Sequence, residues 1–253
     1  MSMWEALAVL AAGIGAGGVN AVVGSGTLLT FPVLLALGYP PVTATISNSI
    51  GLAPGTWAGT FGYRRELAGQ WGRLLRLAGM SLLGAITGAT LLLYLPERVF
   101  VTVVPVLITL SCVLILAQPR LSAWARARGR SRPHGGPWLP LGIYGAGTYG
   151  AYFAAAQGIV LLSILGIALD EGLQRINALK NALAATVNTT AAVFYLIFAV
   201  PDYWAAGLIA VGSIVGGYVG AHVGRRLKPL VLRVIVVLVG LTAAAQLLVE
   251  LFA

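Results

Sequence analysis

Two stretches of the sequence combine glycine or alanine with uncharged polar side chains that could bind a ligand. Residues 20–27 read NAVVGSGT, and residues 154–158 read AAAQG. Hydroxyl and carboxamide groups donate hydrogen bonds, and glycine leaves the backbone N–H groups beside it open to a ligand. This chemistry suits a small anion, which neutral donors can bind and then release.

Two further polar clusters follow these stretches: residues 45–49 read TISNS, and residues 177–181 read NALKN. We expect both stretches and both clusters to line one binding site. Small polar residues also hold packed helices together, and this structural interpretation remains open for each of them. The candidate site residues are Asn20, Ser25, Gly26, Thr27, Thr45, Asn48, Ser49, Gln157, Gly158, Asn177, Lys180, Asn181 and Asn188.

Other chemistries lack the residues that they need. Cys112 is the single cysteine, so the chain forms neither an intramolecular disulfide nor a cysteine-based metal site. The 2 histidines give no metal-binding pattern, and we expect no cofactor. Gly24-Ser25-Gly26 is similar to the GxSG motif of membrane serine proteases, but Val23 stands where that motif needs glycine. An intramembrane enzyme is therefore the weaker alternative.

The composition indicates which elements must position these residues. Of the 253 residues, 58% are hydrophobic and 9% are charged, and the mean hydropathy is +0.91. A soluble domain has about a quarter charged residues, so this chain cannot cover a surface that faces water. The first apolar segment lacks a basic n-region, so we expect no cleavable signal peptide. We predict an all-α polytopic membrane protein, because the apolar runs are continuous and lack the alternation of apolar and polar residues found in barrel strands. The apolar segments fall at 4–23, 27–37, 42–62, 74–95, 99–118, 138–155, 157–169, 177–200, 203–222 and 230–252.

The basic residues predict the orientation in the membrane. Of the 16 lysines and arginines, all except Arg98 fall in four loops, at 64–76, 120–132, 175–180 and 225–233. Cytoplasmic loops carry such an excess, so we expect these loops to be cytoplasmic and both termini to lie outside a bacterial inner membrane. The net charge of +9 then serves orientation and contact with anionic lipids, and predicts no nucleic-acid partner.

The sequence contains signs of an internal repeat. An offset of 132 residues pairs Gly26 with Gly158, Tyr63 with Tyr195, and Ser49 with Asn181. We predict a first repeat at 1–118, a polar cytoplasmic linker at 119–137 and a second repeat at 138–253. Each repeat would be a broken-helix hairpin followed by three transmembrane helices, giving about 8–10 membrane segments. An odd number of segments per half makes the halves inverted copies, an architecture of secondary transporters.

Two segments, 27–37 and 157–169, are too short to cross a bilayer alone. We expect each to follow a turn near the middle of the membrane, where protein or a water-filled cavity must satisfy the irregular backbone. Each turn exposes a new helix N-terminus with a partial positive charge, and two such ends could form an anion site.

Glycines at four-residue spacing predict close helix crossings. They are Gly84 and Gly88 in the first half, and Gly216 and Gly220 at the same offset in the second. Small residues of this kind let membrane helices approach each other closely.

Several motifs resemble one known family, the sulfite exporter TauE/SafE family. They are the glycine-rich turn with Pro32, the sequence LGYPP at 37–41, Ala44–Ser49, Tyr63-Arg64-Arg65, and RINALKN at 175–181 with Asn188. The resemblance covers nearly the whole chain outside the central linker. It implies an inner-membrane carrier that exports small sulfur-containing anions, such as sulfite or the organosulfonate sulfoacetate.

Lys180 is the charged candidate within an apolar segment. Such a residue is a functional-site hypothesis by default, because its burial is costly. A lysine near a helix end can instead extend its ammonium group to the membrane surface, and both interpretations are open.

The energy source of transport is not specified by the sequence. No Asp or Glu falls clearly inside a segment, so a carboxylate proton relay lacks its usual parts. The membrane potential pushes an anion outward by about 2.3 kcal/mol per charge per 100 mV, which is sufficient for uniport. Coupling to protons or a counter-anion, and an anion channel, remain open alternatives. The sequence gives no prediction of the oligomeric state.

Overall fold

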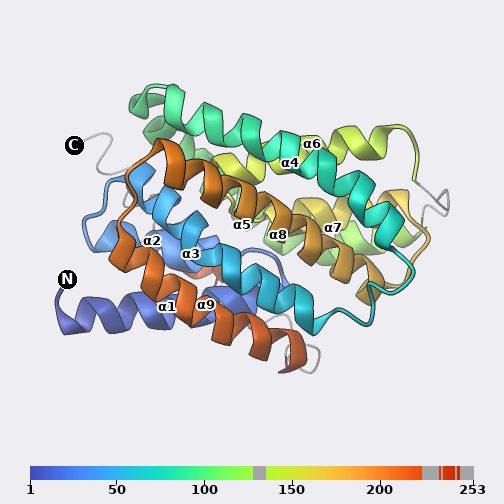
Figure 1. Ribbon diagram of the computed structural model, residues 1–253, viewed down its shortest axis with the longest axis horizontal. Coiled ribbons are helices and arrows are strands. Elements are labelled where there is room, and N and C mark those ends of the chain that lie inside the picture. Colours follow the sequence, from blue (N-terminus) through green and yellow to red (C-terminus); the bar gives the residue numbers. More distant parts are fainter. Residues whose placement is uncertain (128–134, 224–233, 235, 243, 246–253) are drawn as a thin grey trace.

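The computed structural model describes residues 1–127, 135–223, 234, 236–242 and 244–245. The predicted all-α class is confirmed over these residues (Figure 1). The helices are α1 (Met3–Val22), α2 (Thr27–Ala36), α3 (Pro41–Gly62), α4 (Trp71–Tyr94), α5 (Glu97–Ala127), α6 (Trp138–Tyr152), α7 (Gln157–Ala168), α8 (Leu173–Phe198) and α9 (Tyr203–Val223). Residues 236–242 are also helical, and the rest of the segment expected at 230–252 lies largely outside the described residues.

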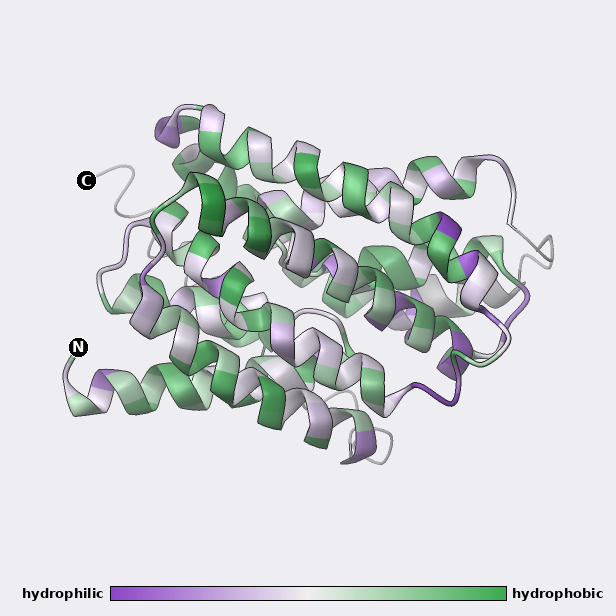
Figure 2. Cartoon of the chain, in the orientation of Figure 1, coloured by the Kyte–Doolittle hydropathy of each residue, from purple (hydrophilic) through white to green (hydrophobic). Residues whose placement is uncertain are grey.

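The chain is a multi-pass membrane protein. Five of the described helices are long and apolar enough to span a bilayer: α1, α4, the Glu97–Arg120 part of α5, α8 and α9. Figure 2 shows apolar residues along the sides of the bundle and hydrophilic residues gathered toward its ends and connections. Large apolar side chains such as Leu75, Val106 and Val211 point outward and are more than half exposed, at 69%, 64% and 59%. Lipid is the solvent that suits such a surface.

Both expected helix breaks are present. Helix α1 ends at Val22 and α2 begins at Thr27, while α6 ends at Tyr152 and α7 begins at Gln157. Left-handed backbone conformations make the two reversals, at Gly24 with φ of 85° and at Ala154 and Ala156 with φ of 67° and 58°. Each pair of helices therefore forms a hairpin whose tip lies inside the bundle (Figure 1).

The predicted close helix crossings are confirmed. Helix α4 packs along α6, and α1 packs along α9. A Cβ atom added to Gly84 would lie 2.2 Å from the carbonyl oxygen of Tyr144, and one added to Gly216 would lie 1.9 Å from that of Ile14. Gly88 and Gly220 meet the backbone of the same two partner helices. Glycine is required here because helix backbones touch directly.

Several helices recur at the offset of the predicted repeat. Pro41 and Leu173, which begin α3 and α8, are 132 residues apart, as are Trp71 and Tyr203, which begin α4 and α9. In Figure 1, α3 and α9 run from left to right, whereas α8 and α4 run from right to left. These features agree with an inverted repeat, which stays a prediction together with its boundaries. Helix α5 continues past residue 118 to Ala127, so part of the expected linker is helical.

Aromatic packing positions the second hairpin tip. Phe31 of α2 and Phe153 of the second turn make an edge-to-face contact with ring centroids 5.5 Å apart. Phe100 of α5 packs against Phe153 from another side, and all three rings are buried. This apolar cluster holds the turn between α6 and α7 against the first half of the chain.

Candidate functional site

The tips of the two hairpins touch each other through backbone atoms. The N–H of Gly158 donates a hydrogen bond of 2.9 Å to the carbonyl oxygen of Gly24. A Cβ atom on Gly24 would lie 2.5 Å from the Cα of Gly158, and the reverse contact would be 2.4 Å. Both positions therefore need glycine, and Gly24 needs it also for its positive φ.

Polar side chains of α8 cap the end of α1. The Lys180 Nζ atom donates to the carbonyl oxygens of Asn20 and Ala21, at 3.2 and 3.5 Å. Asn181 and Asn177 donate their Nδ2 groups to the same Ala21 oxygen, at 3.3 and 3.5 Å. A cation suits this position because the last carbonyls of a helix are unpaired and carry partial negative charge.

Lys180 is fully buried, with 0% of its surface exposed. The extension of its ammonium group to the membrane surface, which the sequence left open, is therefore wrong in this structure. No carboxylate of a described residue lies within ion-pair distance of its Nζ atom. The interior of the bundle thus contains a lysine amine that donates to carbonyl oxygens.

Neutral hydroxyl groups hold the corresponding turn of the second half. Tyr195 donates from its OH group to the carbonyl oxygen of Ala151 at 2.6 Å, near the end of α6. Tyr149 donates from its OH group to the carbonyl oxygen of Ala155 at 2.5 Å. The two hairpins are thus secured by different chemistry, and the cation belongs to the contact with the first.

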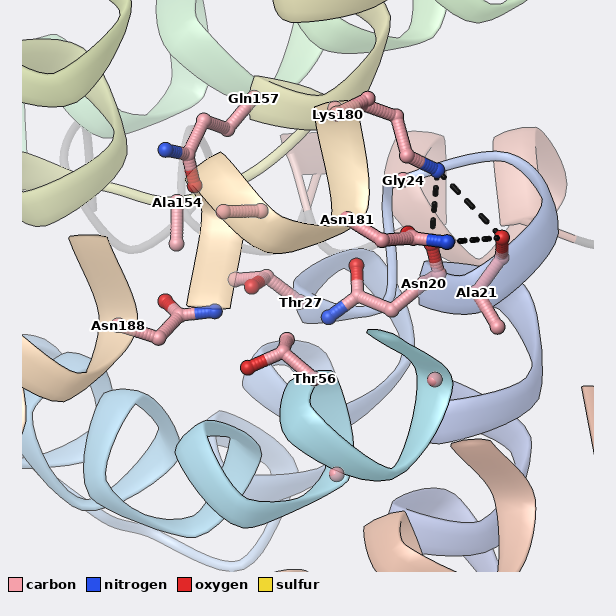
Figure 3. Close-up of a pocket in the computed structure, with 14 residues that line it drawn as sticks. Asn20, Ala21, Gly24, Thr27, Thr56, Ala154, Gln157, Lys180, Asn181 and Asn188 are labelled. Carbon is pink, nitrogen blue, oxygen red and sulfur yellow. Dashed lines mark hydrogen bonds between the residues drawn. The ribbon is translucent and has the colours of Figure 1, made fainter. Parts of the chain in front are cut away.

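Asn20 connects the first turn to the space between the hairpins. Its Oδ1 atom accepts a hydrogen bond of 2.9 Å from the N–H of Gly26. Because Oδ1 is used in this way, the Nδ2 group points into the site, where Asn188 faces it from α8 (Figure 3). The carboxamides of Asn20 and Asn188, from opposite halves of the chain, therefore point toward one space.

A small pocket lies where these groups meet. Its walls come from the end of α1, the two turns, α3 and α8, and the first residues of α2 and α7, Thr27 and Gln157, take part. About 10 Å³ is open to the centres of water molecules, which is room for about one water. The lining residues are Asn20, Ala21, Gly24, Thr27, Gly55, Thr56, Gly59, Ala154, Gln157, Gly158, Lys180, Asn181, Ala184 and Asn188.

The structure brings some of the sequence candidates together at this pocket and places others elsewhere. Those that line it are Asn20, Thr27, Gln157, Gly158, Lys180, Asn181 and Asn188. The candidates outside its lining are Ser25, Gly26, Thr45, Asn48, Ser49 and Asn177.

The contacts of these outer candidates explain their positions. Asn48 joins α3 to α2, because its Nδ2 donates to Thr27 Oγ1 at 3.2 Å and its Oδ1 accepts from Thr30. Thr45 donates to the carbonyl oxygen of Pro41 within its own helix, at 2.9 Å. The hydroxyl groups of Ser25 and Ser49 are buried with no hydrogen-bond partner among the described residues.

The pocket also contains residues that the sequence candidates did not include. Among them, Gly55, Thr56 and Gly59 lie on α3, about two to three turns beyond the polar cluster at 45–49. One signal could have found Thr56, since it precedes Asn188 by 132 residues, the repeat offset. Ala21, Gly24 and Ala154 fall in the two stretches quoted at 20–27 and 154–158 but are not among the sequence candidates, and Ala184 is a small residue with no distinguishing pattern.

Comparison with known proteins agrees with this architecture. The profile of the family described as "Sulfite exporter TauE/SafE" matches residues 9–247, which is nearly the whole chain. The chain belongs to this family.

Relatives of this TauE/SafE member carry transporter names. The Escherichia coli K12 protein named "Probable membrane transporter protein YfcA" is 27% identical over 240 residues, covering 93% of this chain and 86% of the relative. The Sinorhizobium protein named "Probable membrane transporter protein ORF9" is 25% identical over 243 residues, covering 93% of this chain and 89% of the relative. No solved structure matches the chain. This TauE/SafE protein is a membrane transporter, which implies a small-molecule substrate and a lipid environment.

Proposed function

We propose that this protein exports small sulfur-containing anions, such as sulfite or sulfoacetate, across a bacterial inner membrane by alternating access. The family to which it belongs and the chemistry of the pocket support this proposal. The basic end of the bundle would face the cytoplasm, and both termini would lie outside. This end holds the α3–α4 connection and Arg175 at the start of α8; the prediction of a loop at 175–180 is wrong, because these residues lie in α8 and Lys180 is buried in the pocket. An anion channel is the alternative.

The observation that carries the proposal is the buried Nζ atom of Lys180, which is positively charged when it is protonated. A charge in the membrane interior is costly unless a partner of opposite sign or a dipole compensates it. The 14 residues that line the pocket include no Asp or Glu. An anion entering the pocket would therefore meet a positive charge without a competing carboxylate.

Neutral donors of the pocket would orient the anion. Asn20 and Asn188 present carboxamides from opposite sides (Figure 3), and Gln157 has a buried Nε2 group without a hydrogen-bond partner among the described residues. The first turns of α2 and α7 add partial positive charge. Several N–H donors around one space suit the oxygens of a sulfite or sulfonate group.

The size of the pocket agrees with a carrier in an occluded state. Space for about one water is smaller than an oxyanion, so the surrounding helices must separate before the substrate enters. Alternating access through two inverted halves would provide this motion. The membrane potential is sufficient to drive export, at about 2.3 kcal/mol per charge per 100 mV.

Anion flux in proteoliposomes tests the proposal. Purified protein would be reconstituted, and uptake of radiolabelled sulfite, sulfoacetate, thiosulfate and sulfate measured with and without a pH gradient. We expect saturable flux of sulfite or sulfoacetate that responds to an imposed membrane potential. Flux that rises linearly with concentration and at ion-channel rates would favour the channel, and no flux of any sulfur anion would refute the proposal.

A further inference from the structure

Two clusters of polar residues lie at opposite ends of the bundle, outside the pocket. We name them the basic-end latch, formed by Gln70, Arg73, Glu171 and Arg175, and the far-end latch, formed by Tyr39, Ser47 and Asp202. Each latch joins the first half of the chain to the second.

The basic-end latch is built around Glu171. Arg73 donates from Nη1 to Glu171 Oε1 at 2.9 Å and to Gln70 Oε1 at 3.0 Å. Arg175 donates from Nε to Glu171 Oε2 at 2.7 Å and from Nη1 to the carbonyl oxygen of Ala68 at 3.2 Å. These contacts fasten the start of α8 to the connection between α3 and α4.

The far-end latch is built around Asp202. Its backbone N–H donates to Ser47 Oγ at 2.9 Å, and its Oδ1 accepts from the N–H of Ala205 at 2.7 Å. Burial raises the pKa of the Tyr39 hydroxyl, and the negative charge of the nearby Asp202 carboxylate raises it further. These contacts fasten the start of α9 to α3 and to the α2–α3 connection.

The two latches occupy equivalent positions in the two halves. Tyr39 and Glu171 are 132 residues apart, and so are Gln70 and Asp202. At the far end Tyr39 lies within electrostatic range of the Asp202 carboxylate, whereas at the basic end one Arg73 nitrogen bridges Glu171 and Gln70. The same pairing therefore recurs at both ends, with the two halves exchanged.

Each latch is linked mechanically to the pocket. Helix α8 carries Arg175 near its start, and Lys180 and Asn181 follow one to two turns later. Helix α3 carries Ser47 in the far-end latch and Thr56 in the pocket. A rigid-body movement of either helix would move the pocket wall on that helix as well. Both latches are closed in this structure, in agreement with space for only about one water between them.

We propose that the two latches are the alternating gates of transport: opening the basic-end latch admits the anion from one side, and opening the far-end latch releases it on the other. This inference rests on the proposed function, because it assigns each step of alternating access to a set of contacts. A protein in which one latch is weakened would populate the state that is open toward that end.

Thiol labelling of the pocket from each side tests the gates. Cys112→Ala removes the single cysteine, and Ala184→Cys places a reporter in the pocket wall. A membrane-impermeant methanethiosulfonate reagent is then applied to inside-out and right-side-out vesicles. We expect Glu171→Gln to raise the labelling rate from the basic end about tenfold, the effect of losing one charge-assisted hydrogen bond, and to lower it from the far end. Ser47→Ala, which removes the acceptor of the Asp202 N–H, should do the reverse.

Matched controls remove a charge at the same end without touching a latch. They are Asp170→Asn, beside Glu171 in an exposed position, and Glu97→Gln, exposed at the start of α5. Both should leave the labelling rates unchanged. Arg73→Gln breaks the basic-end latch from its other side and decides the result if the Glu171→Gln protein does not fold. Equal changes from both sides, or equal changes in the controls, would overturn the proposal.

The labelling experiment is independent of substrate identity. If the latch variants alter labelling side-specifically but the protein transports no sulfur anion, the gate proposal is supported and the proposed function is refuted. Sulfur-anion flux with labelling that the latch variants do not alter would retain the function and refute the gates.

Discussion

The indole Nε1 of Trp57 donates a hydrogen bond of 2.8 Å to Thr189 Oγ1, and the two residues are 132 positions apart. The bond joins α3 to α8 directly beside Thr56 and Asn188, which line the pocket and have the same separation. When a pseudo-twofold axis relates two repeats, a residue close to that axis lies next to the equivalent residue of the other repeat. This is the contact that the predicted inverted repeat requires between its two central helices.

Removing the donor of this bond should loosen the α3–α8 contact. Trp57→Phe keeps an aromatic ring at a position that is 49% exposed but cannot donate a hydrogen bond. We expect a loss of about 0.5–1 kcal/mol of stability, typical of hydrogen bonds between membrane helices, together with weaker substrate binding. Thermal unfolding in detergent and the substrate concentration at half-maximal flux measure the two effects.

Trp71→Phe is the matched control, because Trp71 is 59% exposed and begins α4 away from the pocket. Thr189→Val should reproduce the Trp57→Phe effect, and the double variant should add nothing further. Full additivity would show that the hydrogen bond does not couple the two helices.

Contact between the hairpin tips should tolerate no side chain. Gly24→Ala and Gly158→Ala would each place a Cβ atom within 2.5 Å of the opposing Cα. We expect each to cost about 1–3 kcal/mol by overpacking, and Gly24→Ala to cost about 1–3 kcal/mol more because of its positive φ. Transport should fall below detection in both.

Gly79→Ala is the control for these variants, since an added Cβ there meets nothing within 4 Å. It lies inside α4 and should stabilise the protein by up to about 1 kcal/mol through helix propensity. Transport at the wild-type rate in Gly24→Ala would show that the observed contact between the tips is not needed.

The charge of Lys180 should be required for anion affinity. Lys180→Gln can still donate to the carbonyl oxygens at the end of α1, but it carries no charge. We expect anion affinity to fall tenfold or more, by about 1.5–3 kcal/mol, while membrane insertion is unchanged. Arg98→Gln, which removes an exposed cation at the start of α5, is the control. Equal flux in vesicles for Lys180→Gln and the wild type would remove Lys180 from the site.

Two variants of Asn20 distinguish its role in the turn from its role in ligand binding. Asn20→Asp keeps an oxygen for the N–H of Gly26 but replaces the Nδ2 donor with a negative charge. The hairpin should persist, whereas anion binding should weaken by about tenfold or more, because a donor becomes a repelling acceptor. Isothermal titration with sulfite compares this variant with Asn20→Ala, which also leaves the Gly26 N–H without its acceptor. We expect Asn20→Ala alone to lower the unfolding temperature clearly.

The ion pairs of Glu171 should make the stability of the folded protein depend on pH. Burial raises its pKa, but hydrogen bonds from Arg73 and Arg175 outweigh burial and hold the pKa below the ordinary 4.5. A depressed pKa in the folded state means that the stabilisation is complete above pH 4.5 and is lost as pH falls through the folded value. The effect should be small, about 1 kcal/mol or less per pair, because these side chains are partly exposed. The unfolding temperature of the wild type, measured from pH 3 to 7, should decrease at the acid end, and this decrease should be smaller in Glu171→Gln.

Part of the site could be predicted because it depends on local sequence. The glycine-rich stretch at 23–26 favours a break in the helix, and the segment that follows is too short to cross a membrane. The hairpin tips, and with them Asn20, Thr27, Gln157 and Gly158, follow from these local constraints. The close crossing of α4 and α6 is likewise encoded by the spacing of Gly84 and Gly88.

The polar clusters show where prediction from sequence ends. Residues 45–49 cover more than one turn of α3, so their side chains point in several directions. Thr45 and Asn48 are used within the first half, and the pocket receives Thr56 from the same helix instead. The choice between these faces depends on how α3 crosses α8.

The sequence by itself determined that the chain lies in a membrane, where its helices break and which glycines permit close crossings, because each of these depends on composition or on neighbouring residues. Tertiary structure alone decided that Lys180 caps the end of α1, because its acceptors Asn20 and Ala21 lie about 160 positions away in the chain. It also decided which polar side chains share the pocket, since the register between packed helices is set by contacts over the whole bundle rather than by local sequence.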